Sequence, residues 1–170
     1  MPVNIIVAHA QNRVIGNANE IPWYIREDMK FFKEATIGKP VIMGRKTYDS
    51  IPAKYKPLPG RITFILTRDT NYVVDHPDVK IAHNLDKAIF EAKLISDEVY
   101  IAGGAQVYEQ ALPYTDRIYA TVLSQDVDGD AFFPQLPSKE WHILDSVEDF
   151  HDENLNLFYR RYIYQKKKES

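Results

Sequence analysis

The chain has 170 residues, 45% of them hydrophobic, and a formal net charge of -3 at pH 7. That length fits one globular domain over residues 1–170 with a sizeable core. The acidic balance argues against nucleic-acid binding, because a protein that coats a polyanion needs a surplus of cations. The absence of cysteine excludes disulfides, thiolate zinc sites and cysteine nucleophiles.

Residues 1–8 are too short and uncharged for a signal peptide, and no apolar run approaches the length that spans a membrane. We therefore expect a cytoplasmic protein with no membrane partner. The five histidines lack metal-ligand spacing, and residues 124–135 lack the acidic ends of an EF-hand loop. No metal site is expected.

Short apolar runs alternate with helix-like stretches through the first two thirds of the chain. The strand-like runs cover residues 3–8, 40–43, 61–66, 79–82 and 98–102. The helix-like stretches cover residues 27–35, 47–51, 85–94 and 105–112. This alternation predicts parallel strands joined by crossover helices.

The pattern changes after Pro113. Strand-like runs at 118–124, 141–147 and 157–165 follow one another with no helix between them, which predicts antiparallel strands at one edge. The predicted fold class is therefore α/β, a single domain whose mostly parallel central sheet of about eight strands has flanking helices and an antiparallel C-terminal edge. Ligands of such sheets bind at the carboxyl ends of the strands.

The connection over residues 10–25 is unusually long for a compact domain, and loops of this length are commonly functional. Apolar residues at 14–15 and 21–23 would anchor it to the core. We expect an ordered lid rather than a disordered segment.

Asp28 begins a helix-like stretch in which Phe31 and Phe32 occupy positions i+3 and i+4, with Trp23 just upstream. Helical spacing puts these side chains on one face, so the carboxyl group would face an apolar wall. Such burial raises the pKa of an acid and suits it to proton chemistry. The alternative is an ordinary acidic first turn that faces the helix dipole.

Residues 44–47 (GRKT) follow a predicted strand and open a predicted helix, a geometry that holds phosphate. The spacing is not that of a P-loop, because an Arg precedes Lys46 and the strand lies between Gly38 and Gly44. A dinucleotide fingerprint of three spaced glycines is also absent from the sequence.

Thr67 and Arg68 follow a third predicted strand. With Arg45 and Lys46 they are candidates to bind a pyrophosphate and one further phosphate, although each alone could be a solvated loop residue. Two alternatives stay open at this point: a small nucleotide phosphotransferase and a non-catalytic nucleotide-binding module.

A series of short segments follows in a fixed order along the chain. They are NRVIG at 12–16, PW at 22–23, DxxxFK at 28–33, KPVIMGRKT at 39–47, SI at 50–51, PLPGR at 57–61, GG at 103–104, VY at 107–108, DGD at 128–130 and FP at 133–134. From residue 5 to about residue 164 this ordered series resembles the dihydrofolate reductase family of the bacterial, monomeric type.

The resemblance implies NADPH-dependent reduction of 7,8-dihydrofolate to tetrahydrofolate, with hydride to C6 and a proton to N5, in support of one-carbon, thymidylate and purine metabolism. It also implies a monomer without an obligatory protein partner, and binding of antifolate inhibitors. Asp28 would bind the pteridine ring nitrogen and 2-amino group, and Arg61 would bind the α-carboxylate of the glutamate tail. Gly103 and Gly104 would be joined by a cis peptide bond.

The resemblance assigns further residues by position. The catalytic set is Trp23, Asp28, Tyr108 and Thr121. The substrate set is Ile6, Val7, Ala8, Asp28, Met29, Phe32, Ile51, Leu58, Arg61, Ala102, Tyr108 and Thr121. The cofactor set is Ala8, Ile15, Gly16, Asn19, Gly44, Arg45, Lys46, Thr47, Leu66, Thr67, Arg68, Ala102, Gly103, Gly104, Ala105, Gln106, Val107 and Tyr108. The lid and its support are Ile21, Pro22, Gly129 and Asp130.

The chain departs from the family pattern at two places. Residues 52–56 lengthen the segment before Pro57, and Ala102 replaces a larger aliphatic residue before the two glycines. The smaller side chain at 102 predicts altered binding of diaminopyrimidine antifolates.

Overall fold

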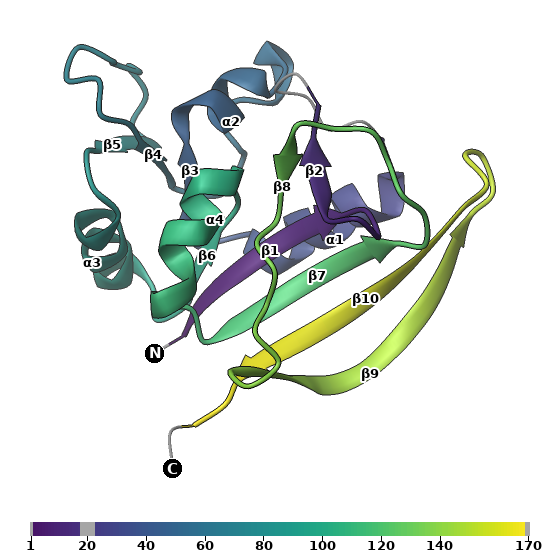
Figure 1. The fold of residues 1–170 in the computed structure, drawn as a ribbon. Coiled ribbons are helices and arrows are strands. Elements are labelled where there is room, and N and C mark those ends of the chain that lie inside the picture. Colours follow the sequence, from purple (N-terminus) through teal and green to yellow (C-terminus); the bar gives the residue numbers. More distant parts are fainter. Residues whose placement is uncertain (1, 18–22, 169–170) are drawn as a thin grey trace.

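The computed structural model describes residues 2–17 and 23–168, apart from the side chains of residues 145–148 (Figure 1). The strands are β1 Val3–His9, β2 Val14–Gly16, β3 Val41–Gly44, β4 Thr63–Leu66, β5 Val79–Ala82, β6 Val99–Ile101, β7 Arg117–Leu123, β8 Ala131–Phe132, β9 Trp141–Asp152 and β10 Leu157–Lys166. The helices are α1 Arg26–Thr36, α2 Arg45–Ser50, α3 Leu85–Ile95 and α4 Ala105–Ala111, with short 3-10 turns η1 Ala53–Tyr55 and η2 Leu112–Tyr114.

The main sheet has eight strands in the order β5-β4-β3-β6-β1-β7-β10-β9. The neighbours in the stretch β5-β4-β3-β6-β1-β7 all pair in parallel, whereas β10 runs antiparallel to both β7 and β9. Figure 1 shows β9 and β10 as a long curved hairpin at one side of the sheet. The predicted α/β class with an antiparallel C-terminal edge is therefore confirmed.

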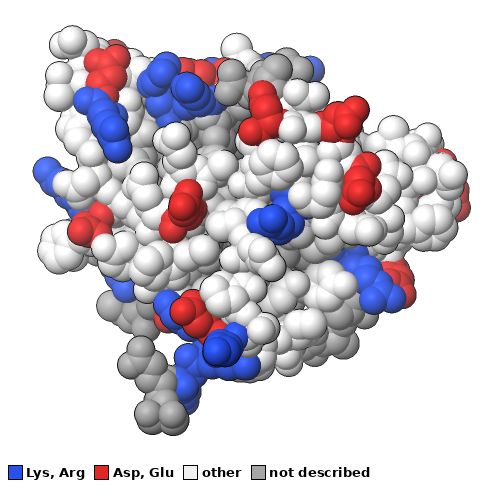
Figure 2. All heavy atoms as spheres, in the orientation of Figure 1, with Lys and Arg blue, Asp and Glu red and all other residues white. Residues whose placement is uncertain are grey.

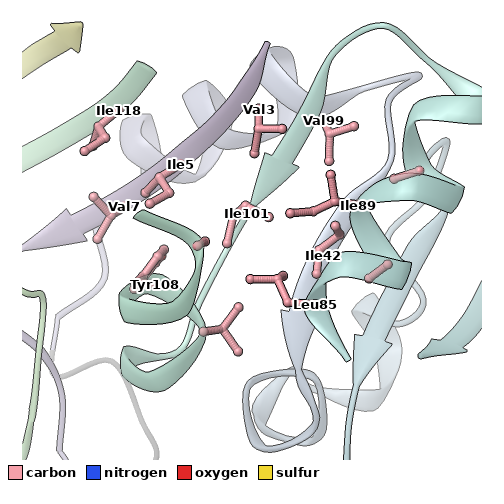
Figure 3. Close-up of a cluster of buried hydrophobic side chains, with 14 of the residues drawn as sticks. Val3, Ile5, Val7, Ile42, Leu85, Ile89, Val99, Ile101, Tyr108 and Ile118 are labelled. Atoms are coloured by element: carbon pink, nitrogen blue, oxygen red, sulfur yellow. The ribbon is translucent and has the colours of Figure 1, made fainter. Parts of the chain in front are cut away.

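The two faces of the sheet are covered by different helices, because side chains alternate along each strand. Val3, Ile5 and Val7 of β1 join a core cluster with α3 and α4, part of which Figure 3 shows. Ile6 of β1 points to the other face, where it packs with residues of α1 and α2. The buried Phe64 of β4 belongs to the first cluster, and Ile65 belongs to the second.

The predicted element boundaries differ from the observed ones by at most two residues, with one exception. The strand expected over 141–147 continues to Asp152, because its backbone pairs with β10 along that length. The sequence prediction also missed the second sheet, in which β2 pairs with β8. Strands of three and two residues are too short to show alternation.

Among the described residues, no helix has both the length and the apolar character to cross a membrane. Positive and negative side chains are interleaved over the face drawn in Figure 2. This distribution agrees with the small net charge of -3.

The segment that carries β8 depends on a close backbone approach at Gly129. The Asp130 amide donates to the Gly16 carbonyl oxygen at 3.0 Å, and the Phe133 amide donates to that of Arg13 at 2.8 Å. A Cβ on Gly129 would overlap Val14 and lie 2.5 Å from the Gly16 oxygen. This contact therefore requires a glycine at position 129.

We expect Gly129→Ala to push the two segments apart, lower the free energy of unfolding by about 1–3 kcal/mol and speed hydrogen exchange of the Asp130 amide. Gly38→Ala is the control for a substitution without overlap: its Cβ would meet nothing within 4 Å, and its φ of 78° alone disfavours a side chain by about 1–2 kcal/mol. Wild-type exchange at Asp130 in Gly129→Ala would show that the overlap does not govern this contact.

Candidate active site

The Asp28 carboxyl group lies in the first turn of α1 and is largely buried, with 15% of its side chain exposed. The Thr121 hydroxyl of β7 donates a hydrogen bond of 2.7 Å to Asp28 Oδ1. Burial raises the pKa of Asp28, while the Thr121 bond and the nearby Arg161 guanidinium act in the opposite direction. A carboxyl group in this environment changes its protonation state closer to neutral pH than an exposed Asp does.

Apolar side chains on the same face of the sheet form a wall next to this carboxyl group. Ile6 is buried there, and Phe31, Phe32, Ile51, Leu58 and Ala102 pack against its cluster. Helix α1 supplies both Asp28 and the two phenylalanines, as the helical spacing predicted. The first turn of α1 thus presents a carboxyl group beside an apolar surface.

The Arg61 side chain is buried, with 6% of the residue exposed. Its Nε donates to the Pro59 carbonyl oxygen at 3.0 Å, and its Nη1 donates to Thr36 Oγ1 at 3.2 Å. The guanidinium carbon also lies 5.8 Å from the centre of the Phe32 ring. These contacts fix a cation near the apolar wall, at a position suited to a ligand carboxylate.

Two strand-to-helix turns meet at the carboxyl ends of β3 and β6. The Gly44 amide donates to the Gly103 carbonyl oxygen at 2.8 Å, and a Cβ on Gly104 would lie 3.2 Å from Thr47 Oγ1. Gly103 has a φ of 110° and is joined to Gly104 by a cis peptide bond, as the resemblance implied. Because neighbouring side chains already occupy the space beside these glycines, the two turns can approach each other only without side chains of their own.

The candidate phosphate ligands lie along the same edge. Gly44 of β3 pairs in register with Leu66 of β4, so Arg45 and Thr67 follow at neighbouring strand ends. Arg45 Nη1 forms an ion pair of 3.1 Å with Asp49, while Arg68 and Lys46 are exposed. The Thr67 hydroxyl accepts a hydrogen bond from the Asp69 amide at 3.1 Å.

Near the first turn of α4, Tyr108 is buried and donates from its hydroxyl to the Ile6 carbonyl oxygen at 2.8 Å. Burial raises the pKa of Tyr108, so the hydroxyl stays neutral. A Cβ added to Gly44 would lie 3.3 Å from the Val107 side chain. Ala105 and Gln106 begin helix α4 directly after the cis bond. Tyr108 therefore connects the β6–α4 turn to the strand that carries Ile6.

The other expected site residues lie at different places around the sheet. The Val7 side chain belongs to the core cluster on the opposite face of the sheet, because it alternates with Ile6. Met29 is 45% exposed, and Trp23 packs against a third cluster around Ala10 and Val14. Ala8 pairs with Thr121 in the sheet.

Part of the segment expected to form a lid lies in the second sheet. Ile15 and Gly16 lie in β2, which pairs with β8, and Gly129 and Asp130 lie against this strand. Asn19, Ile21 and Pro22 are outside the described residues. The base of the expected lid is therefore held by the second sheet.

Arg161 is the charged group that the sequence analysis missed. Its Nη2 lies 3.6 Å from Asp28 Oδ1, although 133 residues separate the two in the chain. The pairing register of β10 on β7 brings them together, and no spacing in the sequence reports that register.

The family model described as dihydrofolate reductase matches residues 2–166. The dihydrofolate reductase of Neisseria gonorrhoeae is 39% identical over 148 residues, which cover 87% of this chain and 88% of the relative. That of Staphylococcus haemolyticus is 36% identical over 166 residues, covering 98% of this chain and 96% of the relative.

Among solved structures, the dihydrofolate reductase from Enterococcus faecalis complexed with NADP(H) and RAB-propyl matches with a TM-score of 0.88 and 27% identity. The match covers 98% of this chain and 97% of that chain. Sequence and fold therefore agree over nearly the whole length, and the chain belongs to the dihydrofolate reductase family.

Proposed function

We propose that this chain reduces 7,8-dihydrofolate with NADPH, with hydride transfer to C6 and protonation of N5 assisted by the site around Asp28. The observation that carries the proposal is a largely buried carboxyl group, bonded to Thr121 and set beside an apolar aromatic wall. Dihydrofolate reductase activity is the activity of the family to which the chain belongs. The residues around Asp28 support a site for that activity.

Asp28 is the anchor for the pterin ring. A carboxylate accepts two parallel hydrogen bonds, which suits a ring N–H and the adjacent 2-amino group. The Thr121 bond fixes one carboxylate oxygen and so orients the pair of acceptors. Ile6, Phe32 and Ile51 provide apolar surface for the flat ring.

Arg61 is proposed to hold the α-carboxylate of the glutamate tail. The bonds to Pro59 and Thr36 orient the guanidinium before any ligand arrives, which lowers the entropic cost of binding. Leu58, three residues before this cation in the chain, packs against the apolar cluster around Ile6.

The residues at the carboxyl ends of β3, β4 and β6 fit a dinucleotide. The turn after β3 opens helix α2, and the backbone N–H groups at such a helix start suit a pyrophosphate held with Thr47 and Lys46. Arg45, Thr67 and Arg68 would hold a 2'-phosphate and so favour NADPH over NADH. When bound, the nicotinamide supplies the hydride.

The lid would exclude water from the reacting atoms. Its base, β2, is held by the 129–133 segment through the backbone bonds of Asp130 and Phe133. The family likeness extends the proposal to a cytoplasmic monomer of one domain that binds antifolates. The small Ala102 beside Ile6 would leave extra room for such ligands.

We expect Asp28→Asn to fold and bind NADPH but to lose most turnover at neutral pH, because the amide does not present two acceptor oxygens to the pterin. Steady-state loss of nicotinamide absorbance with dihydrofolate measures this. Glu27→Gln is the matched control, since it neutralises an exposed acid in the same helical turn and should keep wild-type turnover. Near-normal turnover in Asp28→Asn would mean that Asp28 only faces the helix dipole, as acids in a first helical turn commonly do.

The same substitution has a predicted effect on stability. Because burial raises the pKa of Asp28, the folded chain binds a proton more readily than the unfolded chain, whose Asp pKa is about 3.9. The wild type therefore loses stability relative to Asp28→Asn as pH rises through this window. Urea unfolding from about pH 4 to pH 7 should show the gap widening in favour of the variant. A gap that is constant or narrows would contradict the raised pKa.

We expect Arg45→Gln to raise the KM for NADPH by roughly tenfold to a hundredfold, since a charge-assisted hydrogen bond contributes about 1.5–3 kcal/mol. The KM for NADH, which lacks the 2'-phosphate, should change little. Lys80→Gln, which removes an exposed cation from β5, is the control. Equal changes for the two cofactors would place the 2'-phosphate site elsewhere.

A further inference from the structure

The Arg161 guanidinium forms an ion pair with the Asp28 carboxylate, although Arg161 itself was assigned to neither ligand. Arg161 of β10 pairs in register with Thr121 of β7, and directly paired residues of neighbouring strands share a face. Thr121 and Arg161 therefore approach the same oxygen, at 2.7 Å as a hydrogen-bond donor and at 3.6 Å as an ion-pair partner. Asp28 Oδ1 thus faces both a neutral hydrogen-bond donor, the Thr121 hydroxyl, and a cation, the Arg161 guanidinium.

Two aromatic rings hold the guanidinium in place. Its central carbon lies 3.8 Å from the centre of the Phe31 ring and 4.8 Å from that of Phe150. Both rings attract a cation by their faces and limit its movement. Phe31 is three residues from Asp28 in α1, so the helix that presents the carboxylate also holds its counter-ion.

Arg161 is poorly solvated for a charged residue. Its side chain is 18% exposed, and its Nε is buried without a hydrogen-bond partner among the described residues. A cation that has lost this much water needs an anion nearby. Within the described part of the chain, Asp28 is the acid at ion-pair distance from it.

The other charged groups around the pair come from several elements. A hollow of about 180 Å³ on the outer side of Arg161 is lined by Glu27, Lys30 and Glu34 of α1 and by Tyr159 of β10. On the inner side, the Asp28 charge acts on Tyr108 of α4, and both tyrosines have a raised pKa, so they stay neutral. Of the groups that face Asp28, Arg161 is the one whose positive charge favours the ionised form of the Asp28 carboxyl group.

We propose that Arg161 is a positioning residue that holds the Asp28 carboxylate ionised and oriented toward the pterin, and that it thereby sets the pH range of the reductase. The inference rests on the proposed role of Asp28. Loss of the Arg161 charge leaves only burial and the Thr121 bond, so the carboxyl group would keep its proton to a higher pH.

The test compares Arg161→Met with Arg161→Lys, which restores a charge, and with Arg160→Met as a matched control. Arg160 is the adjacent residue of β10, but its side chain is half exposed and pairs with Asp149. The first readout is the titration midpoint of the Asp28 carboxyl carbon by NMR, assigned by its disappearance in Asp28→Asn. The second readout is the pH profile of turnover.

We expect Arg161→Met to move the Asp28 midpoint upward by about one pH unit. Arg161→Lys should reverse most of that shift, and Arg160→Met should leave the midpoint unchanged. The limb of the turnover profile that Asp28 controls should move in the same direction as the midpoint. In an Asp28→Asn background, Arg161→Met should not move the profile at all.

An unchanged midpoint in folded Arg161→Met, or an equal shift in Arg160→Met, would overturn the inference. Should the Met variant fail to fold, Arg161→Gln removes the charge while keeping a polar head, and the same two outcomes apply. The NMR titration needs no substrate, so a shifted midpoint without dihydrofolate reduction would defeat the proposed function and leave the ion pair standing.

Discussion

The hydrogen bond from Thr121 to Asp28 joins the first turn of α1 to strand β7 of the sheet, and the candidate site depends on it. Burying a carboxylate beside phenylalanine rings is costly, because water no longer solvates the charge. Thr121 and Arg161 offset part of that cost, and the pKa of Asp28 remains raised. The chain thus keeps a carboxyl group that is held in place and exchanges its proton at a higher pH than an exposed Asp does.

The end of β6 connects the two halves of the proposed site. Ala102 packs against the cluster around Ile6, while the next residue, Gly103, accepts a hydrogen bond from Gly44 in the neighbouring turn. Residues proposed to face the substrate and the cofactor are therefore consecutive in the chain. The parallel order of β3, β6 and β1 makes this possible, because their carboxyl ends meet at one edge of the sheet.

The predictable parts of the molecule are those that local pattern and strand polarity determine. Alternating apolar runs indicated the α/β sheet, helical spacing put Asp28 on a face with Phe32, and strand ends brought Arg45 near Thr67. Other features depend on pairing between distant segments. The contact of Arg161 with Asp28 follows from the β10 register, and the β2–β8 sheet is too short to leave a periodic signal. Val7 was placed by family position alone, which does not say to which face its side chain points.

The central claim is that the Asp28 site presents C6 of dihydrofolate to a bound reduced nicotinamide. It is tested most directly by supplying NADPH that carries deuterium at the transferable C4 position and locating the label in the product. The account predicts deuterium at C6 of tetrahydrofolate, on one face only. Product without label at C6, or label on both faces, would contradict it.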